Sequence, residues 1–478
     1  MTQTQPKNLY FLFIVEMWER FAFYIMTGLL VLYLTKVFLF SDNRSYVLFG
    51  IFSSLLWLTP SIGGVVADRW FGFRRAIILG GVFLAIGYSL LACYAHYLFY
   101  LGLGMILIGN GFFKANIPSL VGTLYDGPQD PRRDGGFTIY YMGINLGALI
   151  GPLVAGVVVA KINWHAGFVV AAVGMVAGLI VFIVGQGCLG DRGLAPKTQQ
   201  RSTVSNTIIV YIGAALTALV GAVLLFHVTL STLLMFVCGG GILVFYLYTA
   251  MQQKKSDRNR MLGCLILVVF SIAFWVLYQQ APMSLNLFTE RNIDRHLLGL
   301  HIPTVDYQSL NPFWIFVLTP VMNAFWKKIA GTRLAMPTSM KFTCGIVFMA
   351  LGFLVVAYPA LTTVTGKNIS SWWVFSSYGL QSLGELMLSP IGLSMMTAMA
   401  PKNKTGMMIG MWFLASAVSN ALAGYVAKFA SIPQNLHNPL AASHIYGHAF
   451  MLYGVSALIV GGIAFLSVPV LSKMMRFG

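Results

Sequence analysis

Long apolar stretches recur along the whole chain, from Leu9 to Leu471, and they constrain the fold more than any other feature. Crossing a bilayer as a helix takes about 20 mostly apolar residues, and we count about fourteen stretches of that kind. Of the 478 residues, 58% are hydrophobic and 9% are charged, against roughly 25% charged residues in soluble domains. The alternating strands of about ten residues that build an outer-membrane barrel are absent. The sequence therefore predicts an all-α integral membrane protein.

The expected helices fall into three groups along the chain. The first group covers 9–39, 46–68, 76–95, 98–125, 136–160 and 165–187. A hairpin without internal charges follows at 207–226 and 230–251, and we expect it to be structural. The last group covers 262–288, 310–330, 341–361, 371–400, 406–430 and 446–472. This layout predicts two six-helix bundles, 1–189 and 261–478, a linker and hairpin over 190–260, and a substrate site near the midplane between the bundles.

The positive charge of the chain is distributed unevenly between its loops. The net charge is +17, and most basic residues fall in alternate loops, among them Arg69, Arg74, Arg75 and the run from Lys254 to Arg260. This bias is what the positive-inside rule predicts for a multi-pass protein of the bacterial inner membrane with both termini in the cytoplasm. The lipid bilayer is thus the expected partner. No soluble basic segment with interleaved aromatic residues is present, so no nucleic-acid partner is expected.

Only five charged residues lie deep inside the expected helices. They are Glu16, Glu19, Arg20, Lys114 and Glu385. Each costs about 2.5–3.5 kcal/mol at mid-membrane, so each needs a partner or water and indicates a transport path. Glu16, Glu19 and Arg20 are spaced i, i+3, i+4 and share one face of the first helix. In this half of the chain the only counter-ions for Lys114 are the two glutamates, whereas Glu385 is alone in the second half.

This distribution of charge fits a zwitterionic substrate. A substrate ammonium would approach Glu385, and its carboxylate would approach Lys114 and Arg20. An extended dipeptide spans about 7 Å, a reasonable width for a central cavity. If the substrate carboxylate binds Lys114, the glutamate that loses this counter-ion favours its protonated form, which would couple a proton to transport. The alternative is that Glu16–Arg20 and Glu19–Lys114 only fasten helices together, although apolar residues would do so without the desolvation cost.

Other chemistry finds no support in local motifs. The five cysteines are scattered without metal-ligand spacing, and His444 and His448 stand at the outer entrance of the last helix. Neither a Gly-x-Ser-x-Gly nor a His-Glu-x-x-His motif occurs. We therefore expect no enzyme activity, no metal and no cofactor, with protons as the coupling ion.

Five segments resemble one transporter family. The segment from Glu16 to Tyr24, EMWERFAFY, is similar to the first-helix signature of the proton-dependent oligopeptide transporter family of the major facilitator superfamily. FKAN from Phe113, YYMGINLG from Tyr140, and GEL from Gly384 with SPIG from Ser389 agree with it. The fifth segment, from Gly63 to Arg75, resembles the superfamily's cytoplasmic gating loop. Its candidate gating residues are Gly64, Asp68, Arg69, Arg74 and Arg75.

The resemblance implies a major facilitator fold and symport of protons with di- and tripeptides by alternating access. It implies that Glu16, Glu19 and Arg20 take part in proton coupling and that Lys114 engages them and the peptide carboxylate. It also implies that Glu385 and Asn311 hold the peptide amino terminus. Further pocket positions that it implies are Tyr24, Asn145, Trp275, Trp412 and Ser416. Without the resemblance, Tyr24 and the two tryptophans could equally be packing or interfacial residues.

Two charges typical of the resembled family are missing. Gln279, which we also assign to the pocket, stands where an acidic residue of the seventh helix is typical, and Thr27 replaces an arginine of the first helix. These two charges pair near the outer gate in the family, so the pair is lost together. Coupling must then rest on Glu16, Glu19 or Glu385. Phe23 in place of a tyrosine removes one further hydroxyl, and together these departures predict an atypical branch.

We therefore expect a functional monomer that carries di- and tripeptides with protons. Two alternatives stay open. The first is a related carrier of another small anion or zwitterion such as nitrate. The second is a uniporter or a substrate sensor without proton coupling.

Overall fold

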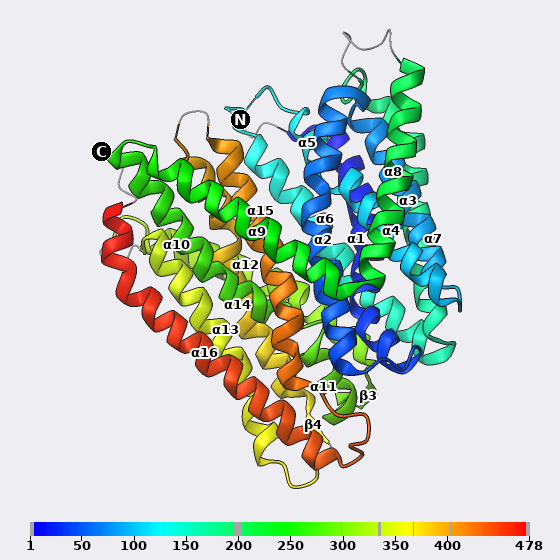
Figure 1. Cartoon of the computed structure of the whole chain (residues 1–478), viewed down its shortest axis with the longest axis vertical. Helices are drawn as coiled ribbons and strands as arrows, with labels where there is room; N and C mark the ends of the chain where they lie inside the picture. Colours follow the sequence, from blue (N-terminus) through cyan, green and yellow to red (C-terminus); the bar gives the residue numbers. More distant parts are fainter. Residues whose placement is uncertain are drawn as a thin grey trace. The chain divides into compact units, whose positions relative to one another are not determined.

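A computed structural model describes residues 4–127, 129–195, 203–297, 299–332, 336–366, 368–401 and 404–474 (Figure 1). Part of the predicted linker, 196–202, lies outside these residues. Eleven of the described helices are long and apolar enough to cross a membrane. Three more, α1 (Lys7–Lys36), α12 (Leu310–Ile329) and α14 (Ser371–Ala398), have 30, 20 and 28 residues, a sufficient length. The described part of the chain thus contains the long helices that the sequence predicts.

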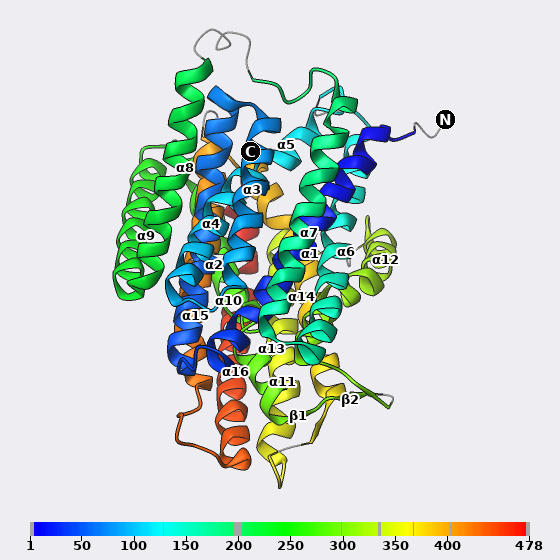
Figure 2. The same cartoon turned by 90° about the vertical axis from the view of Figure 1, so that its right-hand side faces the viewer.

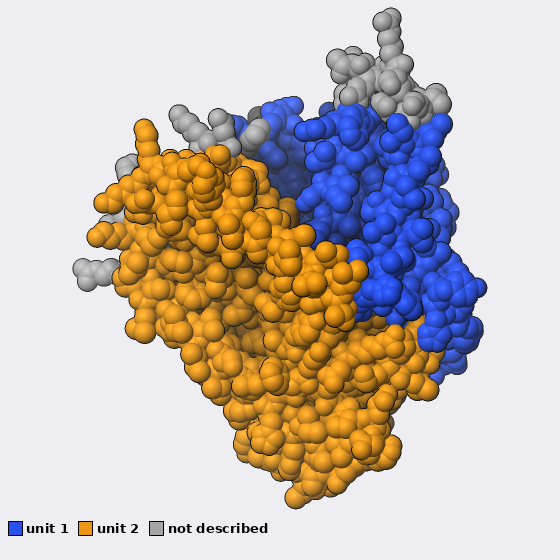
Figure 3. All heavy atoms as spheres, viewed as in Figure 1, with its two compact units in different colours: residues 1–33, 55–228 blue, residues 34–54, 229–478 orange. Residues whose placement is uncertain are grey.

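The chain forms two compact units, 1–33 with 55–228 and 34–54 with 229–478 (Figure 3). Unit 1 contains most of α1, the end of α2 (Asp42–Val66), and the elements that follow up to α8. These are η1 (Ala67–Phe71), α3 (Phe73–Leu91), α4 (His96–Lys114), α5 (Asn116–Gly122), α6 (Arg133–Lys161), α7 (Trp164–Gly185), η2 (Gln186–Leu189) and α8 (Thr203–Phe226). Within this unit α4 packs between α3 and α8 (Figure 2).

Unit 2 contains the residues that join α1 to α2, the start of α2, and the elements from α9 onward. Its helices are α9 (Val228–Met251), α10 (Lys255–Tyr278), α11 (Ser284–Asn292), η4 (Thr304–Ser309), α12, α13 (Thr338–Thr362), α14, α15 (Thr405–Val426), η5 (Ala427–Ala430) and α16 (Pro439–Met474). Its short strands are β1 (Ile293–Asp294), parallel to β4 (Ile369–Ser370), and β2 (His296–Leu297), antiparallel to β3 (Leu300–His301). The helices α13, α14 and α16 pack together (Figure 1).

The two helices of the predicted insertion belong to different units, α8 to unit 1 and almost all of α9 to unit 2. The predicted bundles at 1–189 and 261–478 stay a prediction. Large apolar side chains on α9 are exposed, including Val237, Val244 and Phe245, each at 60% or more. Such a surface suits contact with lipid tails.

Glycines let the helices of unit 1 approach closely. A Cβ atom on Gly147 of α6 would lie 2.3 Å from the carbonyl oxygen of Met17 on α1, and one on Gly63 of α2 would lie 2.1 Å from that of Gly111 on α4. No real side chain fits at such distances. Close packing of this kind holds membrane helices together where apolar burial gives no driving force between them. These two contacts fix α1 and α4, which carry the charged residues.

The predicted helix 98–125 is broken directly after Lys114. Residue 115 separates α4 from α5, because Pro118 has no N–H for the carbonyl of Lys114 and its ring would collide with that carbonyl. The side chain of Asn116 donates to the carbonyl oxygen of Phe112 at 2.7 Å and so stabilises the break. Lys114 therefore ends a helix in the interior of unit 1.

Candidate functional site

The first charged cluster lies on α1 in unit 1. Glu16, Glu19 and Arg20 are 3%, 0% and 5% exposed. Arg20 Nη2 donates to Glu19 Oε1 at 2.7 Å, Arg20 Nε donates to Glu19 Oε2, and Arg20 Nε lies 3.3 Å from Glu16 Oε1. Glu16 Oε2 is buried and accepts no hydrogen bond from the described residues. One guanidinium thus neutralises one of two carboxylates, and the cluster keeps a net negative charge.

Lys114 is held differently from the expectation. Its Nζ lies 4.0 Å from the ring centroid of Trp57 on α2, a cation–π contact. Among the described residues no carboxylate forms an ion pair with it, and Glu19 binds Arg20 instead. The Glu19–Lys114 ion pair of the helix-fastening alternative is therefore not formed, because Arg20, the next residue on the same helix, binds Glu19. The Lys114 ammonium thus contacts the ring of Trp57. Among the described residues it has no counter-ion within ion-pair distance.

The remaining predicted pocket residues of unit 1 lie on α1 and α6. The guanidinium of Arg20 lies over the ring of Phe23, 4.7 Å from its centroid. Thr27 Oγ1 donates to the carbonyl oxygen of Tyr24 at 3.3 Å. Asn145 Nδ2 donates to the carbonyl oxygen of Tyr141 at 3.0 Å, within α6. The structure places Tyr24 on the α1 of the charged cluster and Asn145 on the α6 that packs against it.

The second cluster lies in unit 2 around Glu385 of α14, which is 8% exposed. Asn311 Nδ2 on α12 donates to Glu385 Oε2 at 2.8 Å and to Ser382 Oγ at 3.0 Å. The hydroxyl of Tyr278, at the end of α10, donates to Asn311 Oδ1 at 3.4 Å. In the described parts of the chain no cation forms an ion pair with Glu385. The structure thus brings Glu385 and Asn311 together as predicted, in surroundings of neutral donors.

Of the predicted tryptophans of unit 2, Trp275 packs beside this cluster and Trp412 packs against α14. Trp275 packs edge-on against Tyr278 at 5.3 Å, and its buried Nε1 has no hydrogen-bond partner within the described ranges. The ring of Trp412 on α15 lies on Gly392 of α14, where a Cβ would be 2.0 Å from the ring. Ser416 Oγ donates to the carbonyl oxygen of Trp412 at 3.1 Å. Trp275 thus offers a spare donor, whereas the Ser416 hydroxyl bonds within its own helix.

Of the two glutamines that follow α10, one has a structural role. Gln280 is fully buried, and its Nε2 donates to the carbonyl oxygens of Val276 and Ala423 at 3.1 Å each. Gln279, the predicted pocket residue, is half-buried. The predicted pocket residue Gln279 is thus followed directly by a packing residue.

The predicted gating loop is η1 and the start of α3. Asp68, Arg69 and Arg75 are exposed, and Gly64 packs against Ala115. Arg74 is buried instead: its Nε donates to the carbonyl oxygen of Arg192 at 2.6 Å and its Nη2 to that of Gly190. Arg74 therefore anchors the segment after α7.

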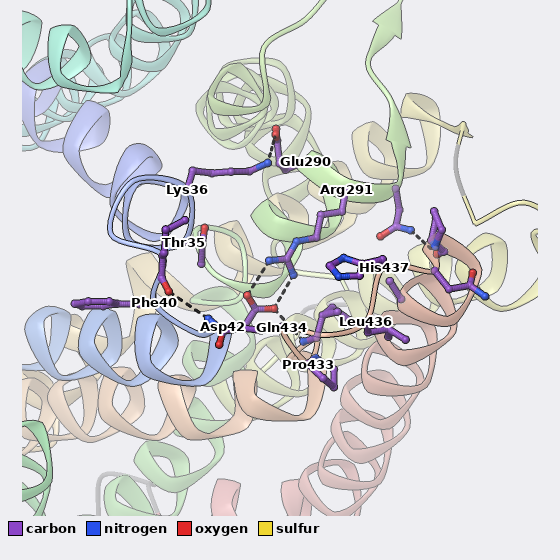
Figure 4. Close-up of a pocket in the computed structure, with 16 residues that line it drawn as sticks. Thr35, Lys36, Phe40, Asp42, Glu290, Arg291, Pro433, Gln434, Leu436 and His437 are labelled. Carbon is purple, nitrogen blue, oxygen red and sulfur yellow. Dashed lines mark hydrogen bonds and ion pairs between the residues drawn. The ribbon is translucent and has the colours of Figure 1, made fainter.

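An ion-paired pocket of ≈ 520 Å³ lies in unit 2, between the α1–α2 connection, α11 and the start of α16 (Figure 4). Arg291 binds Asp42 in bidentate fashion at 2.6 and 2.8 Å, and Lys36 lies 3.1 Å from Glu290. Burial favours the neutral form of Glu290, but the hydroxyl of Thr304 and the charges of Arg295 and Lys36 hold the pKa of Glu290 below its ordinary value. The charges of the pocket are thus paired with one another.

Sequence reasoning missed three residues of the two clusters. Trp57, Tyr278 and Ser382 contact Lys114 or the Glu385–Asn311 pair. None carries a charge that would mark it as a site residue. Only Ser382 could have been noticed, because it precedes Glu385 by three residues on the same helix face.

A set of membrane-length helices with ionised side chains buried inside each of two units defines a multi-pass membrane transporter. Comparisons with known proteins identify its family. The model described as POT family matches residues 74–444. The dipeptide and tripeptide permease B of Edwardsiella piscicida is 36% identical, over 99% of this chain and 96% of that protein. The dipeptide and tripeptide permease A of Escherichia coli (strain K12) is 36% identical, over 98% and 93%.

Solved structures agree with the sequence comparison. A bacterial homologue of the human drug peptide transporters PepT1 and PepT2 superposes with a TM-score of 0.86 at 30% identity, over 98% of this chain and 99% of that one. Tetrameric PepTSo2 superposes with a TM-score of 0.87 at 31% identity, with the same coverage. The chain belongs to the POT family. The predicted major facilitator fold is thereby confirmed, as is the expectation that the chain is not an enzyme.

Proposed function

We propose that this protein is a proton-coupled symporter of di- and tripeptides that works by alternating access. The observation that carries the proposal is a pair of complementary charges without counter-ions among the described residues. Lys114 in unit 1 has an aromatic partner, and Glu385 in unit 2 has neutral donors. A peptide supplies both missing charges at once, its carboxylate for Lys114 and its ammonium for Glu385. The printed names of the relatives and solved structures, which are peptide permeases and transporters, support the same substrate class.

The other predicted residues take the following roles in the proposal. Glu16 and Glu19 share Arg20, so the carboxylate that Arg20 leaves less satisfied, Glu16, is the site that takes up the proton. Trp275, with its spare Nε1 donor, and Tyr24, Asn145, Gln279, Trp412 and Ser416 complete the pocket. The exposed residues of the gating loop close the cytoplasmic side. We propose no cofactor beyond the coupled protons.

We also propose that the protein belongs to an atypical branch of the family, with Thr27 and Gln279 in place of two charges that the resemblance leads us to expect. Thr27 Oγ1 bonds to its own helix, so it offers no replacement for an arginine. Coupling in this branch rests on Glu16, Glu19 and Glu385. The protein functions as a monomer in the bacterial inner membrane, with both termini in the cytoplasm, as its basic loops favour.

Uptake into proteoliposomes tests the proposal. Labelled dialanine should accumulate when the lumen is made alkaline, and Lys114→Ala and Glu385→Gln should each abolish the accumulation. Lys404→Ala, a cytoplasmic loop change, is the matched control and should leave uptake intact. Counterflow without accumulation would show a uniporter, and transport of nitrate without peptide would overturn the substrate class.

A further inference from the structure

Two histidines face each other on an exposed hairpin of unit 2. β2 pairs with β3 in antiparallel register, which sets His296 opposite His301. The backbone N–H of Ile302 donates to the carbonyl oxygen of Arg295 at 2.8 Å and extends the ladder by one pair. Directly opposed residues of such a ladder point to the same face, with Cβ atoms about 4.5–5.5 Å apart. The two imidazole centroids lie 5.1 Å apart, with an angle of 55° between the planes.

This spacing fits two ligands of one metal ion. A zinc–imidazole bond is about 2.0–2.1 Å long, so the ring centroid lies about 3.2 Å from the ion. Two such rings at a tetrahedral angle have centroids about 5 Å apart. The observed separation is therefore the one that a shared tetrahedral ion requires, and the backbone register maintains it.

A neighbouring carboxylate orients one of the two rings. His296 Nδ1 lies 2.8 Å from Asp294 Oδ1, and the backbone N–H of His296 donates to the same oxygen at 3.1 Å. At neutral pH the side chain of Asp294 is a carboxylate, which can only accept hydrogen bonds. The proton of the neutral ring then sits on Nδ1 and the lone pair on Nε2. Metal-binding histidines have this arrangement, with a carboxylate behind the ring.

We propose that the β2–β3 hairpin binds a divalent transition metal ion through Nε2 of His296 and a ring nitrogen of His301, with Asp294 as the orienting group. The described residues contain no group of three or more metal-ligating side chains, so water completes the coordination and the ion exchanges readily. Imidazole ligands select Zn²⁺, Ni²⁺ and Cu²⁺ over Mg²⁺ and Ca²⁺. Arg295, which directly precedes this hairpin, forms an ion pair with Glu290 Oε2 of the pocket wall at 3.1 Å.

Metal titration of the full-length protein, purified without a polyhistidine tag, tests the site. Calorimetry with Zn²⁺ should show one ion per chain, and Cu²⁺ at one equivalent should give an electron paramagnetic resonance spectrum with two nitrogen ligands. His296→Ala and His301→Ala should each weaken binding at least tenfold and leave one nitrogen, and Asp294→Asn should weaken it about tenfold. The matched control, with both His444→Ala and His448→Ala, removes two histidines spaced i, i+4 on α16 and should bind as the wild type does.

The contrary results are equally specific. Unchanged Zn²⁺ affinity in His296→Ala and His301→Ala, or loss of the ion in the control, would overturn the proposal. Weak binding of several ions that no variant changes would indicate an adventitious ion only. Unchanged melting temperatures would show that each variant remains folded.

Discussion

The two charged clusters compensate their buried ionisable groups in different ways. In unit 1 charges are compensated by charges, since Arg20 binds both Glu16 and Glu19. In unit 2 the single carboxylate of Glu385 is stabilised by neutral donors. An ion pair makes each partner depend on the other, whereas hydrogen bonds to a neutral amide leave the negative charge available to a ligand. This difference suits unit 1 to the proton and unit 2 to the substrate ammonium.

The largest effect is expected from breaking the ion pairs of unit 1. Arg20→Met leaves two buried carboxylates without a cation, which costs about 3–5 kcal/mol. The melting temperature of the detergent-solubilised protein should therefore fall further than it does for a single change in unit 2. The double change of Arg20→Met with Glu19→Gln should recover part of the loss. Equal melting temperatures for Arg20→Met and wild type would contradict the ion-pair account.

A smaller effect is expected from removing the neutral donor in unit 2. Asn311→Ala deprives the Glu385 carboxylate of a hydrogen bond, at a cost of about 1–3 kcal/mol. Adding Glu385→Gln should restore most of the lost melting temperature, because no charge then remains to be satisfied. If the double variant melts below the single one, Asn311 acts through packing and not through Glu385.

The cation–π contact of Lys114 should have a moderate effect on transport. Trp57→Leu removes the cation–π contact of Lys114, which is worth up to about 2 kcal/mol in a desolvated site. Lys114 could then pair with a glutamate, which would compete with the peptide carboxylate. The KM for dialanine should rise roughly tenfold, as measured by uptake into liposomes. Trp57→Tyr retains a ring and should stay near the wild type. An equal loss in both variants would show that the indole matters by its shape.

A separate effect, on the pH dependence of stability, concerns a further carboxyl that lies outside the membrane-spanning helices. Burial raises the pKa of Asp306, in η4, from 3.8 to about 7, and Asp306 Oδ1 has no hydrogen-bond partner within the described residues. The folded state binds this proton more tightly than the unfolded state, so the proton stabilises it below about pH 4, and this stabilisation is lost as the pH rises to about 7.

Melting curves between pH 5 and pH 8 test this linkage. The wild type should lose melting temperature with rising pH up to about pH 7, and Asp306→Asn should lack that part of the slope. Asp306 would then be a third case beside the two clusters, because its buried Oδ1 has neither a cation nor a hydrogen-bond donor among the described residues. If the slope of melting temperature against pH is the same in Asp306→Asn as in the wild type, the pH dependence belongs to another group.

The sequence by itself determined which segments span the membrane and which charges lie inside them, because the length and polarity of a helix are local properties. It also determined the Glu16–Arg20 pair, since an i, i+4 spacing brings two side chains together on any helix. The partner of Lys114 was decided only by the tertiary structure. The Gly63–Gly111 contact brings α2 against α4, and the Pro118 break ends α4 at Lys114, so the ammonium meets Trp57.

The same distinction holds for the hairpin histidines. The expectation of no metal followed from the scattered cysteines and from His444 and His448, and it left out His296 and His301. Only the strand register places the two rings together, whereas Asp294 meets His296 through a local i, i+2 contact. Contacts within one helix follow from its period, whereas contacts between helices or strands depend on their crossing and register, which every packed residue of the fold helps to set.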